Sequence, residues 1–271
     1  MKKKKLAKSL RELNYKNYFF KHNLDKFFRK DEISFKHIKY KFDYIFKNNN
    51  KKSYPPELLD LIRLHYLIIS RKVTTILEFG VGFSSLIMAD ALKINEKKYG
   101  LYVRNNLRRG NAFELHSVDT SKKYIKITKN RIPKSLKNKI FMNHSDAHMT
   151  KFNGQICAEF KKIPNICPDL IYVDGPSFMH VKGSKNGIHT RHIDRTIISS
   201  DLLKIESFLL PGTLIIWDGL TSYARFIEKN FRRKWRFEHL PVLDITLAEQ
   251  VEEPLGIYNK KQLEFCLGKK R

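Results

Sequence analysis

Residues 76–85 read Ile-Leu-Glu-Phe-Gly-Val-Gly-Phe-Ser-Ser, an apolar run that leads into a turn with two glycines. The run predicts a buried strand, and the residues after Gly82 predict the start of a helix. Gly80 and Gly82 allow a tight turn and a close approach to a ligand, and a helix N-terminus favours electronegative groups. Ser85 replaces the third glycine of a dinucleotide motif, and no Gly-Lys-Ser/Thr follows as in a P-loop. The stretch therefore predicts a ligand-binding turn, and the residues argue against both of those motifs.

Short apolar runs alternate with helical patterns around this turn. The runs predict strands at residues 75–79, 114–118, 139–143, 169–173 and 213–217. Helices are predicted from Pro55-Pro56 onward and at residues 84–92, 121–130, 199–209 and 221–231. This alternation is typical of an α/β protein with a parallel sheet that helices cover on both faces. Residues 97–111 are expected to form a surface insertion, and residues 236–246 and 255–267 a closing antiparallel pair of strands.

An acidic residue follows or ends each predicted parallel strand. These residues are Glu78, Asp119, Asp146, Asp174 and Asp218. Acids often cap helices at such positions, but ligands of open α/β sheets bind at the carboxyl ends of the strands. An acid at the tip of the second strand can accept hydrogen bonds from both ribose hydroxyls of a nucleoside. Five acids at one edge therefore favour a binding site there.

In order and spacing, residues 76–231 resemble the class I S-adenosylmethionine-dependent methyltransferases. The resemblance implies a three-layer αβα sandwich with a Rossmann-like seven-stranded sheet, whose last strand is antiparallel. It implies S-adenosyl-L-methionine as cofactor, with Glu78, Gly80, Gly82 and Ser84 in the turn beside its methionine part. Ser84 stands where many members have a third glycine. The resemblance further implies that Asp119 holds the ribose and that Asp146 lies near the adenine.

By the same resemblance, Asp174 faces the transferable methyl and the acceptor, which makes it the candidate catalytic base. A divalent metal on Asp174 and Asp218 is an alternative, but it is not favoured because Gly219 stands where metal-dependent O-methyltransferases have Asn. The tetrapeptide of enzymes that methylate base amino groups is also absent, since Asp174 is followed by Gly-Pro-Ser. A zinc site is not expected either, because the spacing of its candidate ligands fits no tight knuckle. Those candidates are His144, His148, Cys157 and Cys167.

Residues 177–195 leave the sheet beside Asp174 and are rich in histidine and arginine. His180, Arg191 and Arg195, together with Asp218, are the candidate substrate-binding residues. Arg191 and Arg195 could clamp a phosphate or a carboxylate. The alternative is an ordinary surface loop with Asp194 and Arg195 as a solvated pair.

The net charge of +26 comes from 53 Lys and Arg against 27 Asp and Glu. Residues 1–52 are expected to form a basic, aromatic-rich helical extension that ends in a linker at residues 48–52, and residues 53–271 the methyltransferase domain. The charge indicates either an anionic partner or compositional drift toward Lys. The extension could dock RNA, but aromatic pairs more often pack against the neighbouring domain or a second subunit, so a homodimer is possible.

No apolar run approaches the roughly 20 residues of a membrane span, so no integral membrane segment is expected. Lys2–Lys5 have no apolar core behind them, and three widely spaced cysteines make no disulfide framework. A cytoplasmic protein is therefore expected. The predicted function is methyl transfer to a hydroxyl of a small molecule or a surface-glycan sugar. The alternatives are an RNA methyltransferase and a non-catalytic protein that binds an anionic polymer.

Overall fold

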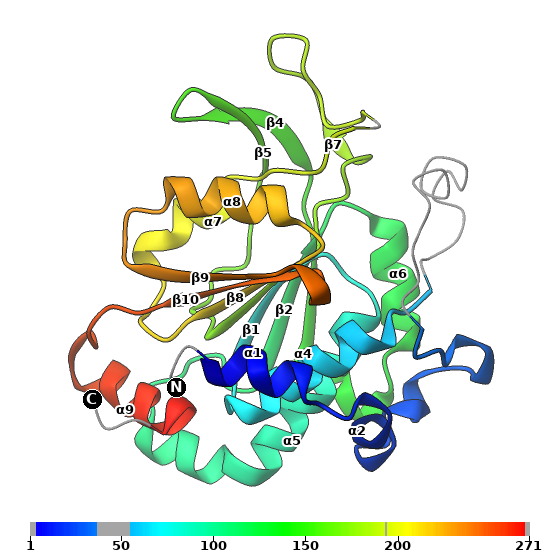
Figure 1. Ribbon diagram of the computed structural model, residues 1–271, viewed down its shortest axis with the longest axis vertical. Coiled ribbons are helices and arrows are strands. Elements are labelled where there is room, and N and C mark those ends of the chain that lie inside the picture. Colours follow the sequence, from blue (N-terminus) through cyan, green and yellow to red (C-terminus); the bar gives the residue numbers. More distant parts are fainter. Residues whose placement is uncertain (1–3, 37–54, 193, 269–271) are drawn as a thin grey trace.

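The computed structural model describes residues 4–36, 55–192 and 194–268, which form a central sheet between two layers of helices (Figure 1). The strands are β1 (Thr75–Phe79), β2 (Glu114–Asp119), β3 (Ile140–His144), β4 (Ala147–Phe152), β5 (Gln155–Phe160), β6 (Leu170–Val173), β7 (Val181–Lys182), β8 (Leu214–Asp218), β9 (Trp235–Leu240) and β10 (Ile245–Gln250). The helices are α1 (Lys4–Arg11), α2 (Tyr15–Lys21), α4 (Leu58–Ser70), α5 (Phe83–Asn106), α6 (Lys122–Arg131), α7 (Asp201–Ile205), α8 (Thr221–Asn230) and α9 (Gly256–Leu267).

The main sheet has seven strands in the order β3-β2-β1-β6-β8-β10-β9. Its first five strands are parallel, and β10, the last strand in the chain, runs antiparallel to both β8 and β9. The register places Glu78 of β1 between Ser117 of β2 and Tyr172 of β6. The predicted Rossmann-like α/β sheet with an antiparallel last strand is thus confirmed.

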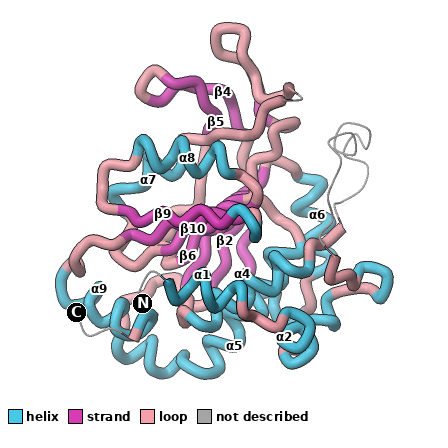
Figure 2. The backbone as a smooth tube through the Cα atoms, viewed as in Figure 1, coloured by secondary structure: helices cyan, strands magenta, loops and turns pink. Residues whose placement is uncertain are grey.

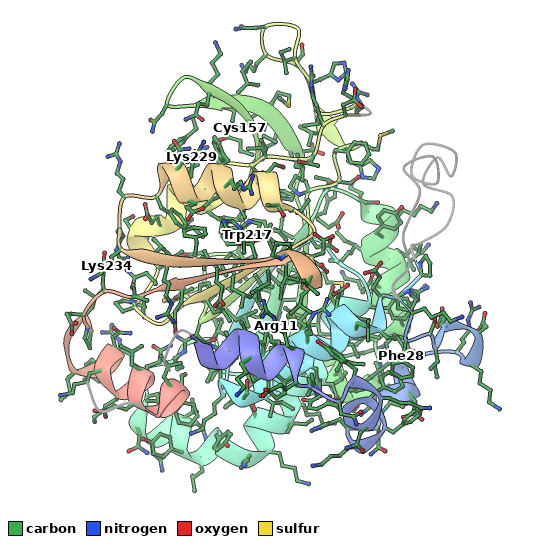
Figure 3. All side chains as sticks on the ribbon, viewed as in Figure 1. Arg11, Phe28, Cys157, Trp217, Lys229 and Lys234 are labelled. Atoms are coloured by element: carbon green, nitrogen blue, oxygen red, sulfur yellow. The ribbon has the colours of Figure 1, made fainter. Side chains whose placement is uncertain are left out.

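Side chains of the central strands point alternately to the two faces of the sheet, so the core has two halves. Ile76 packs with α4 and α5 on one face, whereas its neighbour Leu77 packs with α7 and α8 on the other. Trp217 is fully buried on the second face, and Figure 3 shows it near the middle of the molecule. Successive residues of a strand point to opposite faces, so these all-buried strands are apolar on both sides, as the sequence pattern predicts.

The described part of the N-terminal segment, residues 4–36, packs on α4 and α5. Phe19 and Leu24 are buried against Leu58 and Ile62 of α4, and the ring of Phe28 stacks on Phe83 at the start of α5 with 5.2 Å between ring centroids. Lys26 also forms an ion pair of 2.8 Å with Asp90 of α5. The proposed linker, the boundary after residue 52 and the aromatic residues from 40 to 46 lie outside the described residues.

Three local predictions are wrong. The helix expected at residues 84–92 continues as α5 to Asn106, so the expected insertion at 97–111 is mostly helix. Residues 236–246 are not one strand, because Pro241 begins a 3-10 turn and Asp244, at φ +50°, reverses the chain between β9 and β10. Residues 255–267 form the helix α9 instead of a strand. The antiparallel pair that closes the sheet is therefore β9 and β10.

A second sheet, in the order β5-β4-β7, was not predicted. Its strands β4 and β5 form a hairpin that extends from the body of the molecule (Figure 2), and β7 pairs with β4 in parallel. The turn of the hairpin is Asn153-Gly154, with φ of +47° and +77°. Two consecutive left-handed residues are typical of the tight turn of a two-residue hairpin loop. Of the helices in the described ranges, none is both long and apolar enough to span a membrane.

Candidate active site

The turn after β1 packs directly against the tip of β6. Gly80 has φ +110°, a conformation that L side chains rarely adopt, and its N–H donates to Val118 O over 2.9 Å. The N–H of Asp174 donates to Phe79 O, also over 2.9 Å. A Cβ on Gly175 would lie only 3.1 Å from the nitrogen of Gly80. Glycine at 80 thus permits the conformation of the turn, and glycine at 175 lets the two backbone segments approach closely.

Glu78 lies beneath this turn and holds the start of α5 in place. Its carboxylate accepts hydrogen bonds from Ser84 Oγ (2.6 Å), Ser85 Oγ (2.7 Å) and Ser117 Oγ (2.5 Å). The side chain is buried, and this burial raises its pKa from 4.5 to about 7 although the three hydroxyls act in the opposite direction. In this structure Glu78 and Ser84 shape the turn. Sequence reasoning did not identify Ser85 and Ser117, which complete the arrangement.

Asp119, at the end of β2, lies beside the same turn. Its Oδ1 accepts a hydrogen bond of 2.5 Å from the N–H of Ser121, and the backbone of Val81 also donates to the carboxylate. Burial raises the pKa of Asp119 to about 6, against the effect of these two donors. The carboxylate of Asp119 is thus joined to the glycine turn through the backbone of Val81.

Asp174 lies at the tip of β6, where solvent reaches its side chain but protein surrounds it closely. This surrounding protein raises the pKa of Asp174 well above its usual range, and the neighbouring carboxylates of Asp218, Glu78 and Asp119 raise it further. These four acids lie at or near the carboxyl ends of β1, β2, β6 and β8, at one edge of the sheet. A carboxyl group with a raised pKa is a stronger base once it is ionised.

Asp218 is half-buried at the end of β8 and has a partner within the protein. The hydroxyl of Tyr172 donates to Asp218 Oδ2 over 2.7 Å, and burial raises the pKa of Asp218 to about 6. Arg63, a buried residue of α4, opposes this rise with its charge. Asp218 is therefore part of a polar cluster under α4, whose members Tyr172 and Arg63 were not identified from the sequence.

A cleft with a volume of about 680 Å³ opens beside the ends of β2 and β3. It includes three of the predicted site residues, Asp146, His180 and Arg191. Asp146 Oδ1 lies 2.9 Å from Lys182 Nζ, and this cation lowers the pKa of Asp146. The other lining residues are Thr120, Lys122, His144, Met179, Val181, Lys182 and Gly183. Three separate segments of the chain supply these residues, so no local sequence pattern could have predicted that they line one cleft.

Arg195 does not line this cleft with Arg191. Its Nη1 donates to the carbonyl of His189 over 3.1 Å, whereas Arg191 is exposed at the cleft. Asp194 lies 3.9 Å from the ring of His192, and the structure shows no ion pair between it and Arg195. The structure therefore does not join Arg191 and Arg195 in a clamp.

The four candidate zinc ligands differ in their partners and in their burial. His144 ends β3 and contacts the carbonyl of Thr120, and His148 pairs with Glu159. Cys157 is a buried residue of β5 in the hairpin (Figure 3), and Cys167 is exposed. Within the described ranges, no three His, Cys, Asp or Glu side chains are grouped so that they could hold a metal ion.

No family model and no curated protein matches this sequence. Among solved structures, a methyltransferase of Podospora anserina with bound S-adenosylhomocysteine is similar at 14% identity and a TM-score of 0.44, over 78% of this chain and 86% of that one. A TDP-rhamnose 3'-O-methyltransferase of calicheamicin biosynthesis is similar at 13% identity and a TM-score of 0.44, over 91% of both chains. An O-methyltransferase of Bacillus cereus, also in complex with S-adenosylhomocysteine, matches at 13% identity and a TM-score of 0.41, over 78% and 87%.

The order of the seven strands and the single antiparallel strand agree with the fold that the sequence resemblance implies. The chain therefore has a Rossmann-like α/β fold. At such low identities, the activity of this chain has to be inferred from its own residues.

Proposed function

We propose that this chain binds S-adenosyl-L-methionine and transfers its methyl group to a hydroxyl of a small molecule or of a surface-glycan sugar. One observation carries the proposal: the glycine turn, Asp119 and Asp174 meet at the carboxyl edge of the parallel strands. Ligands of open α/β sheets bind at this edge. The similar structures from Podospora anserina and Bacillus cereus were solved with S-adenosylhomocysteine bound.

The residues at this edge fit the cofactor. A Cβ on Gly82 would meet no atom within 4 Å, so the chain itself leaves open space beside the turn. Gly82 directly precedes α5, whose first N–H groups favour an electronegative group. Asp119 would accept the two ribose hydroxyls, and Thr120 and Asp146 extend the site into the cleft where an adenine would lie. Glu78 would act indirectly, since it fixes the turn through its three serines.

Asp174 is the proposed base. Bound S-adenosylmethionine would supply an electrophilic methyl group on its sulfonium. The task left to the chain is to align the acceptor and to take up its proton. Asp174 can accept this proton because solvent reaches its carboxylate and because the closely surrounding protein, together with the neighbouring acids, raises its pKa. Methyl transfer should therefore become faster as the pH rises and Asp174 ionises.

Residues 179–191, which line one part of the cleft, suggest the kind of acceptor. Lys182 and Arg191 belong to this part, and the acid among the lining residues, Asp146, pairs with Lys182. Such cations suit a phosphate or carboxylate group, as on a phosphorylated sugar. We therefore expect the acceptor to carry both a hydroxyl and an anionic group.

The first experiment is calorimetric titration of S-adenosylmethionine and S-adenosylhomocysteine into the purified chain and three variants. Asp119→Ala removes the proposed ribose acceptor. Gly82→Ala places a methyl group in the open space beside the turn. Gly110→Ala is the matched control, because its Cβ would also meet no atom and its φ is ordinary, but it precedes β2 at the far edge of the sheet.

We expect micromolar binding to the natural chain and to Gly110→Ala. Asp119→Ala and Gly82→Ala should each bind both ligands at least about tenfold more weakly. The first variant lacks the acceptor of the ribose hydroxyls, and the second fills space that the cofactor would occupy. Absence of heat with both ligands, together with an unchanged melting temperature, would refute the proposed cofactor. In that case RNA and other anionic polymers would be the next ligands to test.

A further inference from the structure

Exposed apolar side chains gather on α9 and on the last turns of α5. In the described ranges, ten large hydrophobic residues are exposed, and five of them lie at positions 101–102 and 255–258. Their exposed fractions are Leu101 68%, Tyr102 47%, Leu255 54%, Ile257 65% and Tyr258 56%. Single exposed hydrophobic residues are common, whereas a group of five indicates an interaction site.

Side-chain contacts join the two helices into one surface. The ring of Tyr102 stacks on Phe265 of α9 with 5.2 Å between centroids, and Tyr99 meets the same ring edge-on at 5.4 Å. Arg108, just after α5, lies over the ring of Tyr258 at 5.7 Å. Figure 1 shows α9 beside the C-terminal part of α5. We call residues 93–108 and 255–261 the α5–α9 surface.

The fully exposed charges of the α5–α9 surface are all basic. Seven basic residues are exposed on it, namely Lys93, Lys97, Lys98, Arg104, Arg108, Lys260 and Lys261. Its acid, Glu96, is only half-exposed and is paired with Lys139 at 2.7 Å. The cations flank the apolar residues along the helix, because Lys97, Leu101 and Arg104 follow one another at helical spacing. Basic residues around a protruding apolar ridge are typical of helices that lie in a membrane interface.

We propose that the α5–α9 surface docks the protein on an anionic lipid bilayer. Leu101, Leu255 and Ile257 would enter the region between headgroups and acyl chains, while the seven cations would contact acidic headgroups. Aliphatic residues cannot stack on bases, so a nucleic acid would leave them unused. A second copy of the chain is also disfavoured, since a symmetric contact would bring like charges together.

The proposal is independent of the cofactor and of the proposed reaction. The α5–α9 surface lies at the opposite edge of the sheet from the glycine turn, because α5 begins at the turn and runs back along the strands. Substitutions on this surface should therefore leave cofactor binding unchanged. An experiment can therefore refute the proposed membrane docking without refuting the proposed catalysis, and the reverse.

The test is co-sedimentation of the full chain with vesicles. One set is phosphatidylcholine alone, and the other contains phosphatidylglycerol as about a third of the lipid. The apolar variant is Leu101→Ser with Ile257→Ser, and the charge variant is Lys260→Glu with Lys261→Glu. The matched control is Phe208→Ser with Val242→Ser, two hydrophobic residues that are even more exposed but lie elsewhere. All these side chains are exposed, so the variants should fold, which an unchanged melting temperature would verify.

We expect binding to the acidic vesicles only, with a steep loss when salt rises from about 0.05 to about 0.5 M. The apolar and charge variants should each lower the partition coefficient by about tenfold or more, and the control variant should not. Three results would overturn the proposal: no binding to acidic vesicles, equal binding to both vesicle types, or loss of binding in the control variant. RNA binding or dimerisation that the apolar variant removes, without vesicle binding, would assign the surface to that partner instead.

Discussion

Replacement of Glu78 by Gln should make the protein more stable at alkaline pH. The Glu78 carboxylate is buried, and its pKa is raised from 4.5 to about 7. The folded protein therefore holds this proton more tightly than the unfolded chain does. The resulting stabilisation is complete below pH 4.5 and is lost as the pH rises from 4.5 to about 7. Gln has the same shape and carries no charge, so Glu78→Gln should abolish this loss.

The size of the effect follows from the two pKa values. One pKa unit corresponds to about 1.4 kcal/mol, so ionised Glu78 lowers the free energy of unfolding by about 3 kcal/mol above pH 7. The three serine hydroxyls can rotate, so two can donate to the Gln oxygen and the third can accept from its amide. The hydrogen bonds at the turn should thus largely survive the substitution.

Urea unfolding at about pH 5 and about pH 8 measures this difference. Relative to the natural chain, Glu78→Gln should gain about 2 to 3 kcal/mol between the two pH values. The control is Glu253→Gln, a change at an exposed glutamate, which should follow the natural chain at both pH values. If the difference between Glu78→Gln and the natural chain is the same at both pH values, burial does not raise the pKa of Glu78 and the reasoning is wrong.

Two further predictions concern the base and the core. Asp174→Asn should lower the rate of methyl transfer by about 10²- to 10⁴-fold, while the affinity for the cofactor changes little. The substitution should also remove the rise of the rate with pH. If the rate of the variant still rises with pH, Asp174 is not the base. Arg71→Met should lower the free energy of unfolding in urea by about 1.5 to 3 kcal/mol, because it removes the hydrogen bonds from the buried Arg71 to Glu249 and to the carbonyl of Gly212. Arg236→Met, at the partly exposed partner of the same Glu249, should cost less than about 1 kcal/mol, and equal losses would contradict this account.

The middle of the central sheet could be predicted because β1, β6 and β8 are short apolar runs that are buried on both faces. Strands β2 and β3 are less buried, and they were recognised from their place in the alternation of strands and helices. Helix α5 was predicted too short because Lys97 and Lys98 interrupt the apolar pattern and Gly100 weakens the helix signal. Its later turns bury few residues, among them Asn95 and Val103, so the apolar period disappears from the sequence.

Two other errors have different causes. Residues 255–258, Leu-Gly-Ile-Tyr, suit a strand locally, and α9 forms because Leu263 and Phe265 pack against the body of the molecule. Tertiary packing thus overrides local preference. The hairpin of β4 and β5, in contrast, carried a readable signal, since Asn153-Gly154 is the strongest short hairpin motif.

The site was only partly predictable. The acids at the strand ends follow from topology, since parallel strands bring their carboxyl ends to one edge. The direction in which each side chain points does not follow from the topology. Glu78 faces three serines beneath the turn, and Asp218 bonds to Tyr172. The cleft depends on pairs such as Asp146 and Lys182, which are far apart in the sequence.

Helix α5 has a fixed length, and this length acts as a spacer. It has 24 residues and begins at the glycine turn, and its residues from Lys93 onward belong to the α5–α9 surface. The segment from Phe83 to Leu92 therefore separates the turn from this surface by about 15 Å, at 1.5 Å per residue. A protein docked through that surface would keep the glycine turn outside the lipid contact. Cofactor could then enter and leave while the protein stays bound to the membrane.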